Sequence, residues 1–209
     1  SHDPLLSGQL LVPFLRSDYG AALRDGTDHP LALGPVEELP WMKAQARLTF
    51  ARVGVIDPLS VEEYQAHGGL DGLRRAIGMG PEAIVAEVSE SGLRGRGGAG
   101  FPTGIKWKTV AQASADRKYI VCNADEGDSG TFADRMIMEG DPFVVIEGMT
   151  IAGITVGATK GYIYIRSEYP HAVEAMNAAI AAGSSSTRAP VSASLRHGRP
   201  PCRVQSWSL

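Results

Sequence analysis

The sequence predicts an α/β fold built around a pair of parallel strands. Two runs rich in β-branched and aromatic residues, KYIVCNA at 118–124 and KGYIYIRSE at 160–168, are typical of strands. Helical patterns fill the interval between them, at 131–140 and 143–156, and another follows at 169–182. Strands that alternate with helices at this spacing form βαβ units, whose strands run parallel.

The helices have recognisable start and stop signals. Ser60 with Glu63 three residues later forms a capping-box pattern that predicts a short helix ending at Gly68. A second helix is expected from Pro81, a residue favoured at the first helical position, to Gly92. The apolar run at 142–158 is shorter than the roughly 20 residues needed to cross a bilayer, and it contains a glutamate, so it predicts a buried helix.

Composition divides the chain into three regions. Residues 1–57 contain many prolines between short apolar runs, as expected of an irregular connector. Residues 58–182 contain the α/β pattern. Residues 183–209 contain seven serines, four arginines and three prolines but no aspartate, glutamate or lysine, which predicts a disordered tail or translation in a shifted reading frame.

The overall charge and the cysteines exclude several classes of function. A formal net charge of -3 argues against a general nucleic-acid binder, which needs a concentrated positive surface. Two distant cysteines, Cys122 and Cys202, form neither a disulfide framework nor a metal cluster, as expected of a protein from the reducing cytoplasm. The first residues carry no basic segment before an apolar run, so no signal peptide and no membrane insertion are expected.

The glycine-rich segment SGLRGRGGAGFPTGIKW, residues 91–107, is the first candidate site. It occurs once and follows a capped helix, unlike repeated RNA-binding arginine-glycine tracts, and it lacks the spacing of a Walker phosphate loop. Gly95, Gly97 and Gly100 match G-x-G-x-x-G, although that pattern normally follows a strand. Glycines permit close approach of backbone amides to a phosphate or a flat ring. A nucleotide site and a packed turn are both consistent with this segment.

The second candidate is VCNADEGDSGTFADR, residues 121–135, at the carboxyl end of the first strand. Open α/β sheets bind their ligands at this edge. The polar residues Asn123, Asp125, Glu126 and Asp128 suit hydrogen bonds to a flavin ring or to ribose hydroxyls. A magnesium site and an acidic turn that caps the helix near Thr131 are the alternatives.

The two candidate segments together resemble the flavoprotein subunit of NADH-oxidising complexes. The resemblance continues through MEGDPFVVIEGMTIAGITVGATKGYIYIRSEYPHAVEAMNAAI and covers about residues 45–182. That family includes the NADH-binding subunit of respiratory NADH:quinone oxidoreductase and the diaphorase subunits of NAD-dependent formate dehydrogenases and hydrogenases. The segment NADEGDSGTFADRMIMEGDP is most similar to the formate dehydrogenase β subunit.

This resemblance implies a Rossmann-like parallel sheet that binds FMN and NAD(H). Electrons pass between NADH, the flavin and iron-sulfur clusters in such subunits. The implied cofactor-binding residues are Gly95, Arg96, Gly97, Gly98, Phe101, Lys106, Asn123, Asp125, Glu126 and Asp128, with Phe101 stacking on the dinucleotide. Asp128 stands where the family has an acidic residue near NADH. No catalytic side chain and no metal ligand is assigned.

The resemblance also implies that only the amino-terminal part of the flavin domain is present. The rest of that domain and the cysteines that bind a [4Fe-4S] cluster in the full-length family are absent from this sequence. The first residues resemble the end of a thioredoxin-like domain. We therefore expect either a dehydrogenase subunit, with an iron-sulfur or thioredoxin-like subunit and a catalytic subunit as partners, or a truncated or frameshifted non-catalytic fragment.

Overall fold

The computed structural model describes residues 39–128, 130–186 and 202–208, and it divides the chain into two units, Ser1–Thr49 and Phe50–Leu209. The described part of the first unit contains one short helix, α3 (Pro40–Lys43), with a proline in its first turn. The second unit contains the sheet and the remaining described helices. Residues 50–57, which the composition groups with the connector, belong to this second unit.

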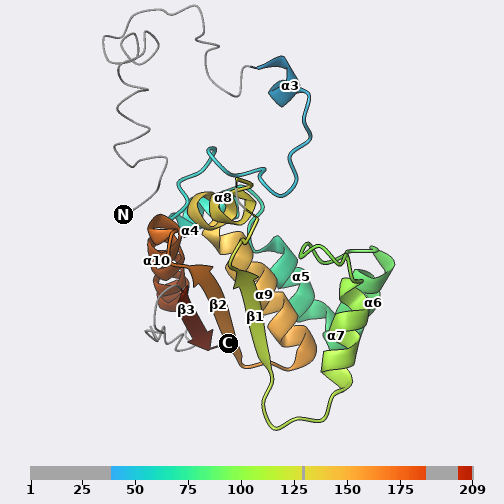
Figure 1. Ribbon diagram of the computed structural model, residues 1–209. Coiled ribbons are helices and arrows are strands. Elements are labelled where there is room, and N and C mark those ends of the chain that lie inside the picture. The colour runs from blue at the N-terminus through green and yellow to red at the C-terminus, as the bar shows by residue number, and fades with distance from the viewer. Residues whose placement is uncertain (1–38, 129, 187–201, 209) are drawn as a thin grey trace, which may run out of the picture. The chain divides into compact units, whose positions relative to one another are not determined.

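The sheet confirms the predicted parallel pair and adds a third strand. β1 (Tyr119–Ala124) pairs with β2 (Lys160–Arg166) in parallel, from Tyr119 beside Lys160 to Ala124 beside Ile165. β3 (Cys202–Ser208) lies antiparallel on the other side of β2, giving the order β1-β2-β3 (Figure 1).

The expected disorder of the tail does not hold where the structure describes it. The last helix, α10 (Pro170–Ser186), continues past Ala182, and β3 lies within the region whose composition predicts disorder. Backbone pairing explains the difference, because the β2 edge offers hydrogen bonds that do not depend on the composition of the incoming segment. Residues 187–201 and 209 lie outside the described part of the chain.

Helices cover one face of the sheet. α8 (Ala133–Gly140) and α9 (Pro142–Val156) connect β1 to β2, and α10 follows β2 (Figure 1). Ile163 and Ile165 of β2 are fully buried in a core with residues from α8, α9 and α10, including Met138, Met149 and Met176. The opposite face of β1 and β2 exposes Tyr119, Val121 and Tyr164. These alternating strands therefore bury one face only.

Four helices precede the sheet in the second unit. They are α4 (Val61–Ala66), α5 (Asp71–Met79), α6 (Pro81–Glu90) and α7 (Thr103–Gln112). The α4 cap is as predicted, because Ser60 Oγ accepts a hydrogen bond from the Glu63 amide at 3.1 Å. The Glu63 carboxylate accepts a hydrogen bond from the Asp57 amide, so it does not form the second hydrogen bond of the capping box, which would come from the Ser60 amide. Neither α5 nor α7 is predicted from the sequence.

A buried glutamate explains why α5 carries no local start signal. Leu70, the residue before α5, offers no side-chain cap. The carboxylate of Glu147, inside α9, accepts hydrogen bonds from the amides of Leu70 and Leu73, both at 2.8 Å, and from the Tyr64 hydroxyl. The cap of α5 therefore comes from a helix more than 70 residues away in the chain, which no local pattern can reveal.

A second buried carboxylate joins residue 52 to the start of α9. Asp141 is 1% exposed and accepts a 2.8 Å hydrogen bond from Arg52 Nε, whose guanidinium also lies 4.7 Å from the centre of the Tyr64 ring. Burial raises the pKa of Asp141.

Among the described residues, no helix is long and apolar enough to span a membrane.

Candidate functional site

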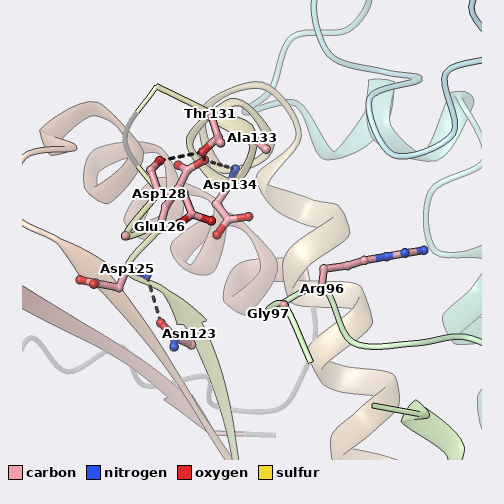
Figure 2. A pocket seen from close by; sticks show the side chains of 11 residues that line it. Arg96, Gly97, Asn123, Asp125, Glu126, Asp128, Thr131, Ala133 and Asp134 are labelled. Carbon is pink, nitrogen blue, oxygen red and sulfur yellow. Dashed lines mark hydrogen bonds between the residues drawn. The ribbon is translucent and has the colours of Figure 1, made fainter. Parts of the chain in front are cut away.

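A pocket of about 570 Å³ lies between the glycine-rich loop and the turn that follows β1. Figure 2 shows the two walls facing each other across the cavity. The lining residues are Arg96, Gly97, Gly98, Asn123, Asp125, Glu126, Gly127, Asp128, Thr131, Ala133 and Asp134. The structure thus brings together at one pocket the two segments whose residues predict a cofactor site.

Backbone hydrogen bonds close the base of the glycine loop. The Gly95 amide donates to the Phe101 carbonyl at 2.9 Å, and the Thr103 amide donates to the Leu93 carbonyl at 2.8 Å. Arg94 Nη1 adds a 2.9 Å bond to the Gly100 carbonyl. The loop is therefore a closed structure with a defined tip, not a flexible spacer.

The tip of the loop has room for a ligand beside its backbone. Gly98 has φ +90° and Gly100 φ +59°, backbone conformations that favour glycine. Gly97 has no such requirement, and a Cβ built on it meets no atom within 4 Å. Among the described residues, the amides of Gly97, Gly98 and Ala99 donate no backbone hydrogen bond. Free amides around an open concavity are typical of anion sites.

Another glycine of the same segment has a packing role. Gly104 lies buried in α7, and a Cβ there would be 2.6 Å from the Cα of Ser89 in α6. The absence of a side chain therefore permits close contact between the two helices. The segment combines tip glycines that leave space open for a ligand with one glycine that the packing of helices requires.

Three of the predicted residues on this segment lie away from the pocket lining. Phe101 stands at the base of the loop with 48% of its surface exposed. Lys106 is on α7, since that helix begins at Thr103, and is exposed. Gly95 is also outside the lining and forms part of the loop base. Figure 2 shows the Arg96 side chain directed away from the acidic wall.

The opposite wall is an acidic turn, residues 125–128, directly after β1. Asn123 Oδ1 accepts from the Asp125 amide at 3.2 Å. Glu126 has φ +46°, an uncommon conformation for a residue with a side chain. Its carboxylate turns back toward the following helix.

The Glu126 carboxylate caps α8. Oε1 accepts from the Thr131 hydroxyl and the Asp134 amide, both at 3.0 Å, and Oε2 accepts from the Arg135 amide at 3.1 Å (Figure 2 shows the bonds to Thr131 and Asp134). A carboxylate at a helix N-terminus satisfies free amides and interacts favourably with the helix dipole. The capping alternative considered for this acidic segment is therefore correct for Glu126.

Asp134 and Thr131 line the pocket but were not predicted to do so. Asp134 lies in the first turn of α8, and its carboxyl pKa is raised by burial and then by the nearby Glu126 charge. Burial, and to a smaller extent Asp134, raises the pKa of the Cys122 thiol to about 11. The sequence signal that could have placed Asp134 in the pocket is an acidic residue in the first turn of a helix. Such a residue is explained equally well by its favourable interaction with the helix dipole, so the signal does not by itself indicate a pocket.

The pocket chemistry suits a flavin nucleotide better than a metal ion. No group of three or more His, Cys, Asp or Glu side chains in the described segments could hold a metal ion. Free amides at the loop tip suit a phosphate, and carboxylate and amide oxygens opposite suit ring imide or ribose hydroxyl donors. The volume lies within the range of roughly 300–1,000 Å³ usual for small-ligand sites. The residues present therefore fit FMN.

An α/β sheet with a glycine loop and an acidic turn at one pocket is typical of nucleotide-binding domains. The profile of the Nuo51 FMN-binding domain matches residues 88–199, more than half of the chain. The chain belongs to this family.

Individual relatives agree with the family match. The chain is 51% identical over 138 residues to the NADP-reducing hydrogenase subunit HndC of Solidesulfovibrio fructosivorans, covering 66% of this chain and 28% of the relative. It is 52% identical over 130 residues to an NADH-quinone oxidoreductase subunit of Rhizobium meliloti, covering 62% and 31%. The chain therefore spans less than a third of the length of these curated relatives.

Solved structures show the same fold. The air-oxidized NAD+-reducing [NiFe]-hydrogenase is similar with a TM-score of 0.51 and 32% identity, over 68% of this chain and 23% of that one. Its H2-reduced form gives a TM-score of 0.53 and 28% identity, over 88% and 29%. The predicted family and the α/β fold class are thereby confirmed.

Proposed function

We propose that this chain binds FMN in the pocket between the glycine loop and the acidic turn, as part of a flavoprotein that exchanges hydride with NAD(H). The observation that carries the proposal is the open tip of the glycine loop, whose amides donate no backbone hydrogen bond and which lines one cavity together with the polar residues of the acidic turn. A flavin held there would supply the redox chemistry, as a two-electron hydride acceptor toward NADH and a one-electron donor toward a partner.

Each wall has a distinct role in this proposal. Gly97 and Gly98 hold the phosphate end through their amides, because no side chain blocks the approach. Asn123 and Asp125 accept hydrogen bonds from the flavin ring or ribityl chain. Glu126 fixes the wall by capping α8. Asp128, which also lines the pocket, contacts the dinucleotide in this proposal.

NAD(H) is expected to approach from the side of the loop base. Phe101 is exposed there and offers a flat apolar face for stacking. Lys106 and Gly95 complete the set of proposed contacts by resemblance alone, since neither lines the pocket.

The relatives support a redox subunit of a larger enzyme. One is named a subunit of an NADP-reducing hydrogenase and others are named NADH-quinone oxidoreductase subunits. We propose iron-sulfur and catalytic partner subunits for this protein, as the family resemblance implies. We also propose that the chain is of the formate dehydrogenase β-subunit type, and this proposal is supported by the segment NADEGDSGTFADRMIMEGDP alone.

Flavin titration of matched glycine variants tests the proposal. Gly97→Val places a side chain where only open space exists, so we expect unchanged thermal stability and at least a tenfold weaker FMN affinity, equivalent to about 1.4 kcal/mol. Gly148→Val is the control, because Gly148 is exposed in α9 and equally free of contacts. Gly104→Ala should instead lower the melting temperature, since its Cβ collides with Ser89.

FMN binding by the wild-type chain is measured by quenching of flavin fluorescence, and turnover by NADH-dependent ferricyanide reduction. Wild-type protein that folds but binds no FMN would contradict the proposal and favour the non-catalytic fragment. Equal affinities for Gly97→Val and wild type would show that the flavin phosphate does not contact the loop tip. FMN binding without ferricyanide reduction would limit this chain to the cofactor-binding step.

A further inference from the structure

We propose that Arg166, at the end of β2, is a positioning residue that holds the acidic turn in its flavin-binding shape. The inference rests on the proposed FMN site. Arg166 does not line the pocket, and no sequence pattern predicts a role for it. Its action is indirect, through the backbone of Glu126.

The guanidinium of Arg166 contacts three groups at once. Nη1 donates to the Glu126 carbonyl at 3.0 Å, and Nη2 and Nε approach the Glu168 carboxylate at 3.4 Å. The guanidinium carbon also lies 5.3 Å from the centre of the Tyr169 ring. The planar fork of arginine can make these contacts together, whereas a lysine ammonium cannot.

Sheet topology explains why this arginine reaches the pocket wall. β1 and β2 run parallel, so their carboxyl ends meet at one edge. Arg166 is the last residue of β2, and Glu126 is the second residue after β1. The bond between them joins segments 40 residues apart in sequence.

The acidic turn needs such support because its backbone is unfavourable. Glu126 has φ +46°, and Phe132, just before α8, has φ +50°. Left-handed conformations of residues with side chains persist only when surrounding contacts impose them. Arg166 supplies the contact at the first of these positions.

An arginine and aromatic stack supports the second position. The Phe132 and Tyr169 rings have centroids 6.4 Å apart, and the Arg135 guanidinium lies 5.8 Å and 5.4 Å from them. Tyr169 also borders Arg166, so one continuous cluster supports both ends of the wall. Loss of Arg166 should therefore loosen the Glu126 cap on α8 and, through it, the flavin site.

Hydrogen exchange of the ligand-free protein tests this directly. The amides of Asp134 and Arg135 donate to the Glu126 carboxylate, so their protection reports the position of Glu126. In Arg166→Ala we expect their protection to fall roughly tenfold, the effect of losing one charge-assisted hydrogen bond, with amides of α9 unchanged. Arg166→Lys should recover part of the protection. Arg75→Ala, which breaks an exposed ion pair with Glu87, is the control.

FMN titration and the visible circular dichroism of bound FMN are measured on the same variants. We expect weaker FMN binding and an altered flavin signal for Arg166→Ala, with intermediate values for Arg166→Lys. Unchanged protection at Asp134 and Arg135 would overturn the inference, as would an equal loss of protection throughout α9. If the wild-type chain binds no FMN, the proposed function fails, while exchange at these two amides still decides whether Arg166 positions the turn.

Discussion

Replacement of Glu126 tests whether this residue is part of the architecture of the site. Its carboxylate accepts from the Thr131 hydroxyl at 3.0 Å, the Asp134 amide at 3.0 Å and the Arg135 amide at 3.1 Å. Glu126→Ala removes all three acceptor contacts and the negative charge at the start of α8. Glu126→Gln keeps the oxygen that serves Thr131 and Asp134 but offers an amide group to Arg135.

The expected loss follows from these contacts. Removal of a helix cap costs about 0.5–2 kcal/mol, and loss of a favourable charge at a helix N-terminus about 0.3–1 kcal/mol. We therefore expect Glu126→Ala to lower the free energy of unfolding by about 2 kcal/mol. Glu126→Gln should lose roughly half as much, because two of its three acceptor contacts can remain.

Urea unfolding followed by circular dichroism measures both values. Glu87→Ala is the matched control, because it breaks an exposed ion pair with Arg75 and should change stability by less than about 0.5 kcal/mol. If Glu126→Ala unfolds at the same urea concentration as wild type yet binds FMN weakly, Glu126 contacts the ligand and the capping argument is wrong.

Two further predictions concern titratable groups beside the pocket. Because the folded pKa of Asp134 lies above 3.8, its contribution to stability is greatest at low pH and is lost as the pH rises through the raised pKa. The Asp134→Asn variant should therefore have a higher melting temperature than wild type at pH 7 and an equal one near pH 3. A lower melting temperature of the variant at pH 7 would contradict this. The rise of the Cys122 pKa from 9.0 to about 11 lowers its thiolate fraction roughly 100-fold at neutral pH. Mass spectrometry should therefore show much slower iodoacetamide labelling of Cys122 in native than in unfolded protein, and equal rates would refute the raised pKa of this half-buried thiol.

Local patterns predicted the elements whose signals lie within them. The strand at Tyr119–Ala124, the capped helix after Ser60 and the helix from Pro81 follow from β-branched content, a cap and a proline at the first position. α5 was missed because its cap comes from Glu147 of α9. β3 was missed because the composition of its region predicts disorder, whereas the strand forms through backbone pairing with β2.

For the candidate site, the sequence alone determined the residue types and their two segments, a glycine loop and an acidic turn after a parallel strand. Tertiary structure decided that Gly97, Gly98 and the acidic turn line one pocket, while Phe101 and Lys106 lie outside its lining. It also decided that Glu126 caps α8 and that Arg166 contacts its backbone. The physical reason is that residue type and periodicity are local properties, whereas these contacts join segments that only the packing of helices on the sheet brings together.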